Sequence, residues 1–343
     1  MTSSGSLIRG FACRHDPVKV GVVGLGKMGL LHSSILNVLP NAELTAACDK
    51  SRTLCRFFRK LLKGVRIVDN VEKFSDLDLD AIYVTAPIRF HFLVAKTVYL
   101  KTIARNLFVE KTLAWNHEEA RKMSDLADQF GGVNMVGYLR RFAVTFKKAR
   151  NLLAHEAIGK LTTFRAYAYS SDFLSSKGNP AALSSRGGVL RDLGCHAIDL
   201  ALWFVEDLQT DSVSITSATR TGDSTRFTVE NAHGLQGEFE VSCSMENYRM
   251  AEVGFSIQGS EGMIEVNDDK LELKSSDKES ITWYRHDLKD NVPYWLGLPE
   301  YYREDSYFIE SVAKRRRADP SFDCASKTDR IIELVTHGAN ARG

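Results

Sequence analysis

Asp192 and His196 have the residue types and the spacing that proton removal from an alcohol requires. On a helix, Asp192, His196 and Asp199 would lie along one face, because side chains three and four residues apart are neighbours. A carboxylate beside an imidazole fixes the orientation and tautomer of the ring and stabilises its charged form, as a general base needs. An ordinary Asp–His pair on a helix surface has the same pattern. The adjacent Gly187-Gly188 turn and serine-rich segment favour the functional interpretation.

Lys111 is the third candidate, because it follows the apolar run Phe108–Val109 at the end of a predicted strand. Ligands of open parallel sheets bind outside the carboxyl ends of the strands. We therefore expect Lys111 to point into a cofactor crevice. A lysine that is merely solvated at a strand end is the plain alternative.

The segment Gly24-Leu25-Gly26-Lys27-Met28-Gly29 is a G-x-G-x-x-G motif between a predicted strand and a predicted helix. That context is the one that a dinucleotide-binding turn requires. The first glycine permits the tight turn, the second lets the pyrophosphate approach the backbone, and the third allows close helix packing. Free N–H groups at the helix start would hold the phosphates, so Lys27 and Met28 are also predicted cofactor contacts.

Asp49 ends the second predicted strand, 20 residues after the last glycine of the motif, where an acidic side chain can bind ribose hydroxyls. Its charge would repel a 2′-phosphate, which favours NAD. Lys50 and Arg52 follow at once and could hold that phosphate, so NADP remains the alternative.

The first third of the chain alternates short apolar runs with helical patterns, which is typical of an α/β fold with a parallel sheet. A helix is expected to begin after Asn116, which with Glu119 resembles a capping box. The predicted strands are Val18–Val23, Glu43–Cys48, Val65–Val68, Ala81–Thr85, Asn106–Val109 and Val133–Val136.

After about residue 137 the pattern changes. We expect a helix over Ala143–Ala154, a strand over Leu161–Tyr169, a long loop over Ser170–Gly188 and a helix from about Gly188 to Phe204. From Asp211 to Tyr284 the chain reads as strands joined by turns, which predicts an antiparallel or mixed sheet. Further helices are expected over Tyr302–Arg317 and Thr328–Val335. Apolar side chains of Phe239–Cys243 and Val253–Ile257 are expected on the uncovered face of the sheet, where they would form a subunit interface.

The composition excludes several classes of protein. The 343 residues carry a formal net charge of only +2, which gives no reason to expect a nucleic-acid or membrane partner. No apolar run is long enough for a transmembrane helix, and the N-terminus lacks the apolar stretch of a signal peptide. The six cysteines are scattered without zinc-ligand spacing. These features predict a cytoplasmic protein with reduced thiols and no metal site.

Several segments together resemble the glucose–fructose oxidoreductase / inositol dehydrogenase / MocA (Gfo/Idh/MocA) family over about residues 18–320. The resemblance implies an NAD(P)-binding Rossmann domain over residues 18–137, after an extension of residues 1–17. It also implies an α+β domain over residues 138–343, with a large, mostly antiparallel sheet whose open face mediates formation of a homodimer or homotetramer. The C-terminal helix can pack back on the Rossmann domain. The segments that carry the resemblance are Gly24–His32, Cys48–Ser51, Thr85–His91, Val109–Thr112, Gly137–Phe142 and Gly187–Asp199.

The resemblance also implies roles for individual residues. Lys111, Asp192 and His196 match a proton-transfer and substrate-orienting cluster. The segments around it are implied to contact cofactor through Thr85, Pro87, His91 and Glu110, and substrate through Tyr138, Arg141 and Asp172. The chain departs from the family pattern where Thr112 and Ala86 replace the usual Pro and Thr, and where Ile88-Arg89 stands in place of the usual Asn.

The implied activity is exchange of a hydride between NAD(P) and a ring hydroxyl or carbonyl of a sugar, a sugar derivative or a cyclitol. Either Lys111 or His196 could be the base. Two other functions fit the same resemblance: a glycoside hydrolase that uses bound NAD for a transient oxidation, and a non-catalytic dinucleotide-binding regulator.

Overall fold

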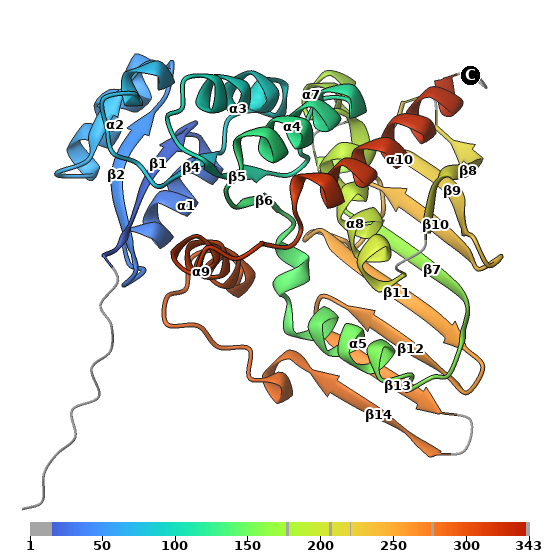
Figure 1. Cartoon of the computed structure of the whole chain (residues 1–343). Helices are drawn as coiled ribbons and strands as arrows, with labels where there is room; N and C mark the ends of the chain where they lie inside the picture. Colours follow the sequence, from blue (N-terminus) through green and yellow to red (C-terminus); the bar gives the residue numbers. More distant parts are fainter. Residues whose placement is uncertain (1–15, 176–177, 206–207, 220, 276–277, 341–343) are drawn as a thin grey trace, which may run out of the picture.

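The computed structural model describes residues 16–175, 178–205, 208–219, 221–275 and 278–340, and it contains two β-sheets (Figure 1). The first sheet has the strand order β3-β2-β1-β4-β5-β6, and every neighbouring pair is parallel. The predicted parallel α/β sheet is therefore confirmed. Most of the predicted extension lies outside the described residues. The strands are β1 (Val18–Val23), β2 (Ala42–Cys48), β3 (Arg66–Val68), β4 (Ala81–Val84), β5 (Asn106–Glu110) and β6 (Asn134–Gly137).

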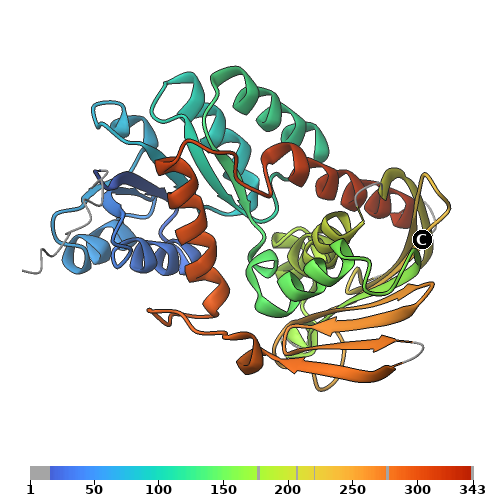
Figure 2. The same cartoon turned by 60° about the horizontal axis from the view of Figure 1, so that its bottom comes forward.

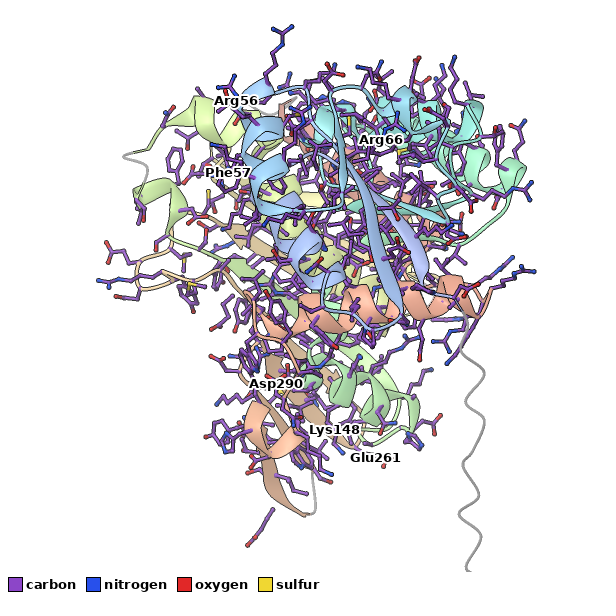
Figure 3. The ribbon with its side chains drawn as sticks, turned by 90° about the vertical axis from the view of Figure 1, so that its left-hand side faces the viewer. Arg56, Phe57, Arg66, Lys148, Glu261 and Asp290 are labelled. Carbon is purple, nitrogen blue, oxygen red and sulfur yellow. The ribbon has the colours of Figure 1, made fainter. Side chains whose placement is uncertain are left out.

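Helices cover both faces of this sheet because its central strands are apolar along their whole length; all four residues of β4 are buried. Two helices begin at side-chain caps, since Ser51 accepts a hydrogen bond from Leu54 and Asn116 accepts one from Glu119. The cap at Asn116 confirms the predicted helix start. On the outer surface of α2, Arg56 and Phe57 are exposed (Figure 3). The helices are α1 (Lys27–Leu36), α2 (Arg52–Leu61), α3 (His91–Leu100) and α4 (His117–Phe130), with short 3-10 turns at Val71–Phe74, Ile88–Phe90 and Leu139–Phe142.

The second sheet has eight strands in the order β14-β13-β12-β11-β7-β10-β9-β8. Only β7 and β10 pair in parallel among these described strands, so the sheet is mostly antiparallel, as predicted. The strands are β7 (Leu161–Tyr169), β8 (Leu208–Ala218), β9 (Ser224–Asn231), β10 (Gln236–Ser242), β11 (Glu252–Gly259), β12 (Gly262–Asn267), β13 (Lys270–Ser275) and β14 (Lys278–Tyr284).

Helices α5 (Val144–Ala154) and α8 (Cys195–Phe204) lie against one face of the second sheet, between it and the first domain (Figure 2). The register shows which side chains they cover: Ala166 of β7 lies beside both Phe239 and Phe255, and all three are buried. The apolar segments expected on the uncovered face therefore lie on the covered one, and that part of the prediction is wrong. The uncovered face instead carries charged and tyrosine side chains, including Arg165, Tyr167, Tyr169, Arg226, Glu238 and Glu240.

The predicted loop over Ser170–Gly188 contains two short helices, α6 (Asp172–Ser175) and α7 (Pro180–Ser185). The predicted helix that follows starts with a π-helical turn, Leu190–Gly194, before α8 begins. A π turn closes on the fifth residue rather than the fourth, so it rotates the side chains within it relative to those of α8.

Two C-terminal helices return to the first domain. Helix α9 (Pro299–Ala313) packs against α1, and α10 (Phe322–Asn340) packs against both α4 and the strand β8. Asp290, in the segment before α9, accepts hydrogen bonds from Arg285 and Arg303 and fixes the entry of that helix (Figure 3). Across the described residues, no helix combines the length and the apolar character needed to cross a membrane.

Candidate active site

The turn between β1 and α1 has the shape that a dinucleotide-binding turn needs. Gly24 has a φ of +102°, and an added Cβ would lie 2.5 Å from the backbone of Ala86. At Gly29 an added Cβ would lie 1.8 Å from the Gly24 carbonyl oxygen, so both positions exclude any side chain. Gly26 faces open space with nothing within 4 Å, and α1 starts there without a side-chain cap. Space and free N–H groups thus coincide at the helix start, which fits the pyrophosphate of a dinucleotide.

Asp49 lies beside this turn. Its two carboxylate oxygens accept hydrogen bonds from the N–H groups of Leu25 and Ser51, each at 2.7 Å. These bonds fix the carboxylate at the end of β2, next to the glycine turn, as predicted for a group that binds ribose. Lys50 and Arg52 are exposed nearby.

Thr85 and His91, which were expected to contact the cofactor, are both turned into the protein. The Thr85 hydroxyl donates to the Gly24 carbonyl at 2.7 Å and so supports the glycine turn from below. His91 lies between the carbonyl oxygens of Thr112 and Ala86, at 2.9 and 2.8 Å, and is buried. Its contacts join the ends of β4 and β5. Pro87, between them, is exposed.

Lys111 follows β5 at the carboxyl end of the sheet, and its side chain is 22% exposed. Its Nζ donates to the main-chain oxygen of Asp192 at 2.5 Å and lies 3.4 Å from Oδ1 of the same residue. Burial lowers the pKa of Lys111, but Cys195, Asp192 and Glu110 outweigh that effect, and the pKa is raised above its usual value. Lys111 is therefore a cation near neutral pH.

Asp192 is shared between two cations. Besides Lys111, its carboxylate binds Arg186, with Nη1 and Oδ2 2.6 Å apart, and Asp172 lies 3.8 Å from the same guanidinium nitrogen. Within the described parts of the chain, no hydrogen bond joins Asp192 to His196, so the prediction that these two side chains form a pair is wrong. The reason is the π-helical turn at Leu190–Gly194, which ends the i, i+4 relation between the two side chains.

His196 is buried beside the ring of Tyr138, with the two ring centroids 6.2 Å apart. Its Nδ1 has no hydrogen-bond partner among the described residues. Burial, and then the positive charges of Arg140 and Lys111, hold the pKa of His196 well below its usual value. The imidazole is therefore neutral at physiological pH and able to accept a proton.

Two of the expected substrate contacts are enclosed in the protein. Tyr138 is fully buried. Arg141 forms two hydrogen bonds to Asp199, at 2.8 and 2.7 Å, and also binds Asp319. A guanidinium that is already paired with two carboxylates has no donor to spare for a sugar, so Arg141 holds the domain junction together instead. Of these three, Asp172 alone is exposed, and it reaches the site through Arg186, the guanidinium that also binds Asp192.

Glu110 also departs from the expectation that it contacts cofactor. Its carboxylate is buried, where it accepts from the Lys111 N–H at 2.9 Å and from His32 Nε2 at 2.9 Å. Sequence reasoning missed two neighbours of the site: Arg186, which binds Asp192, and Asp305, which binds His32. Asp305 is 273 residues from His32 along the chain, and no local pattern connects the two.

Two family profiles match the chain. Residues 18–138 match the description "Oxidoreductase family, NAD-binding Rossmann fold", and residues 146–265 match "GFO/IDH/MocA C-terminal domain". The chain belongs to the Gfo/Idh/MocA oxidoreductase family. The expected family is thereby confirmed, and its NAD-binding domain is the one that contains the glycine turn and Asp49.

The Gfo/Idh/MocA chain is similar to several proteins that are named as dehydrogenases. It is 26% identical over 202 residues to glucose-6-phosphate 3-dehydrogenase of Bacillus subtilis, a match that covers 57% of this chain and 56% of the relative. It is 27% identical over 194 residues to myo-inositol 2-dehydrogenase of Thermotoga maritima, which covers 55% of each. The chain thus spans about half the length of the curated relatives it matches.

Among solved structures, levoglucosan dehydrogenase in complex with NADH and levoglucosan superposes on this Gfo/Idh/MocA chain with a TM-score of 0.84. The superposition covers 96% of this chain and 98% of that one, at 20% sequence identity. At this identity the likeness establishes that both proteins share the two-sheet fold.

Proposed function

We propose that this protein is an NAD-dependent dehydrogenase that acts on a CH–OH group of a sugar, a sugar derivative or a cyclitol. The observation that carries the proposal is that a positively charged lysine and a neutral histidine lie near each other at the carboxyl end of β5. A cationic Lys111, partly exposed beside Asp192, lies at the same end of the parallel sheet as the glycine turn. The neutral imidazole of His196, near the start of α8, lies close enough for the charge of Lys111 to act on it. Relatives named for oxidation of glucose 6-phosphate and inositol support the substrate class.

The residues divide the chemistry as follows. The turn Gly24–Gly29 and Asp49 hold the dinucleotide, whose nicotinamide ring supplies the hydride acceptor. His196 takes the hydroxyl proton, because its depressed pKa leaves the imidazole neutral. Lys111 donates a hydrogen bond to the same oxygen and stabilises its negative charge as the C–H bond breaks. Asp192 and Arg186 limit the positions open to the Lys111 ammonium.

NAD is the proposed cofactor in preference to NADP, because the fixed Asp49 carboxylate would meet a 2′-phosphate. The proposed division into a cofactor domain, residues 18–137, and a substrate domain, residues 138–343, follows the two sheets. We further propose a cytoplasmic location. The described cysteines, none of them in a disulfide, support it.

The uncovered face of the second sheet is the proposed contact with a second copy of the chain, in a homodimer or homotetramer. Arg165 with Glu238, and Arg226 with Glu240, form rows of alternating charge that a two-fold related copy can meet with opposite charges. Light scattering at micromolar concentration tests this proposal, with a monomer of 38.4 kDa as the contrary result.

A spectrophotometric assay tests the proposed activity. The enzyme is mixed with NAD or NADP and with myo-inositol, scyllo-inositol, glucose, glucose 6-phosphate or levoglucosan, one at a time. We expect steady formation of NADH with at least one of them. Release of a sugar from a glycoside without net NADH formation would indicate the hydrolase instead. Binding of NAD without either reaction on a broad panel would indicate the regulator.

A further inference from the structure

Glu110 and Lys111 are adjacent, yet their side chains point to opposite sides of the strand end. Lys111 faces the candidate active site, whereas Glu110 faces a closed interior behind it. One Glu110 oxygen accepts the main-chain N–H of Lys111 at 2.9 Å, and the other accepts His32 Nε2 at 2.9 Å. The orientation of the Glu110 carboxylate is therefore coupled to the backbone that carries Lys111.

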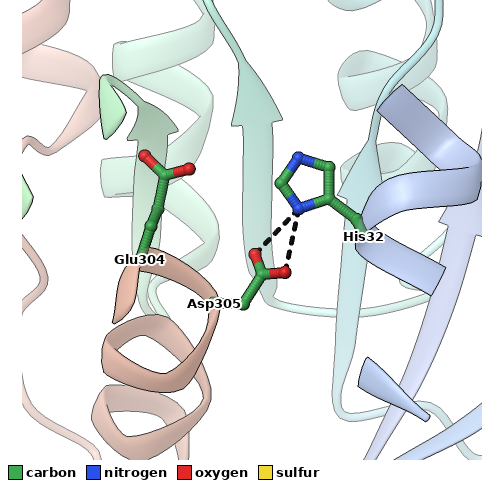
Figure 4. Close-up of side chains that lie close together, drawn as sticks. All are labelled: His32, Glu304 and Asp305. Carbon is green, nitrogen blue, oxygen red and sulfur yellow. Dashed lines mark hydrogen bonds and ion pairs between the residues drawn. The ribbon is translucent and has the colours of Figure 1, made fainter. Parts of the chain in front are cut away.

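His32 continues this connection to α9. Its Nδ1 forms hydrogen bonds with both carboxylate oxygens of Asp305 (Figure 4), and the two distances are 2.8 and 3.0 Å. The His32 ring and the Asp305 side chain are completely buried. Burial lowers the pKa of His32, but Asp305 and Glu110 outweigh it and raise the pKa well above its usual value. The protonated ring donates to a carboxylate on each side, and such charge-assisted bonds are short and directional.

We infer that His32 and Asp305 are positioning residues for Lys111 and act on it through Glu110. The inference rests on the role proposed for Lys111. Helix α1 supplies His32 directly behind the dinucleotide-binding turn, and α9 supplies Asp305 from the end of the chain. The same contacts thus fix the lysine relative to the cofactor turn. Without Asp305, the imidazole of His32 has one hydrogen-bond partner instead of two. Glu110 is then held less firmly and can turn away from the Lys111 N–H.

Glu304 provides a matched control beside Asp305. It is on the same helix and is equally buried, and neither of its carboxylate oxygens has a hydrogen-bond partner among the described residues. Glu304→Gln therefore changes a buried carboxylate without breaking the connection from Asp305 to Lys111. Ligand atoms of His32, Glu304 and Asp305 also lie within 4.8 Å of one another, a spacing that a divalent cation could use. If a cation were the purpose of the cluster, Glu304→Gln would be as harmful as Asp305→Asn.

The first measurement does not depend on activity. Lys111 is acetylated with limiting acetic anhydride in the whole protein, and its labelling rate is compared by mass spectrometry with that of exposed Lys101. Asp305→Asn and His32→Gln should each raise the acetylation rate of Lys111 about threefold or more, because an ammonium that is no longer held by Asp192 is more accessible to the reagent. Glu304→Gln should leave it unchanged. Equal rates in all four proteins, or equal changes in Asp305→Asn and Glu304→Gln, would overturn the inference.

The second measurement separates positioning from a general loss of structure. In the wild-type background, Asp305→Asn should lower kcat about 10- to 100-fold with little change in NAD affinity, because misplacement of a reacting group by an ångström has effects of this size. In the Lys111→Ala background it should lower kcat no further. The same fold-loss in both backgrounds would show that Asp305 acts elsewhere. Should no substrate be turned over, the proposed function fails while the labelling result still decides the positioning role.

Discussion

The two sides of the β5 end differ in how they hold charge. On the closed side, His32 and Asp305 are fully buried, and the imidazole forms hydrogen bonds of close to 3 Å with the carboxylates of Asp305 and Glu110. On the open side, Lys111 and Asp192 are 22% and 27% exposed, and their charged atoms lie 3.4 Å apart. Buried charges are stable only when paired closely, whereas a group that must bind a substrate needs a partner that it can leave. Two adjacent residues therefore differ in role: Glu110 is held in place by buried hydrogen bonds, whereas Lys111 has a partner that it can exchange for a substrate.

The largest expected effect is on turnover, on the open side. Lys111→Ala and His196→Ala should each lower kcat about 10²- to 10⁴-fold, the usual contribution of a general acid or base. NAD affinity should change little, because the glycine turn is untouched, and isothermal titration checks this. Combining the two substitutions should be little worse than the worse one alone. His196→Ala with more than about a tenth of wild-type turnover would remove His196 from the mechanism.

The next effect is on stability, on the closed side. His32→Leu leaves Asp305 and Glu110 without their cation and should lower the free energy of unfolding by about 3–5 kcal/mol, as for other broken buried pairs. Urea unfolding measures it. Asp76→Asn, which breaks an exposed pair with Arg66, is the control and should have no measurable effect. Equal effects of the two substitutions would contradict the distinction between the sides.

A smaller effect is expected on cofactor choice. Asp49→Ser removes the carboxylate that would repel a 2′-phosphate, while Arg52 remains nearby. The ratio of NADP affinity to NAD affinity should rise about tenfold, which corresponds to about 1.4 kcal/mol. Fluorescence titration with both reduced cofactors measures the ratio. Wild-type protein that binds NADP more tightly than NAD would count against the role of Asp49.

The smallest effect concerns Asp329 on α10, a buried carboxylate without the close imidazole that Asp305 has. Burial raises the pKa of Asp329 to about 8, against the lowering effect of Arg191. A carboxyl with a raised folded-state pKa stabilises the fold at low pH, and this contribution is lost as the pH rises through that value. Asp329→Asn should therefore gain about 1 kcal/mol relative to wild type between pH 5 and pH 8. Parallel pH dependences of the two proteins would contradict the assignment.

The sequence was sufficient for the features that depend on local patterns. The apolar strand runs and the glycine spacing predict the parallel sheet, the turn and the nearby Asp49. Lys111 is predictable at the crevice because β5 ends one residue before it. The π-helical turn could not be foreseen, since its residues also fit an ordinary helix, and it redirects Asp192 from His196 to Lys111.

Long-range pairs were equally beyond prediction from the sequence. Arg141 looks like a free cation in the sequence, but folding brings Asp199 and Asp319 onto it from distant segments. The same is true of His32 and Asp305. The alternation of apolar and polar residues correctly predicts strands in the second sheet, but it does not indicate which face of the sheet the helices cover.

Transfer of deuterium tests the central claim most directly. The protein is incubated with NAD and with its best substrate from the panel, deuterated at every CH–OH carbon, and the NADH formed is analysed by mass spectrometry. We predict that the NADH carries deuterium and that Lys111→Ala forms it far more slowly. NADH without deuterium, or substrate conversion that leaves NAD unreduced, would contradict the proposed hydride transfer.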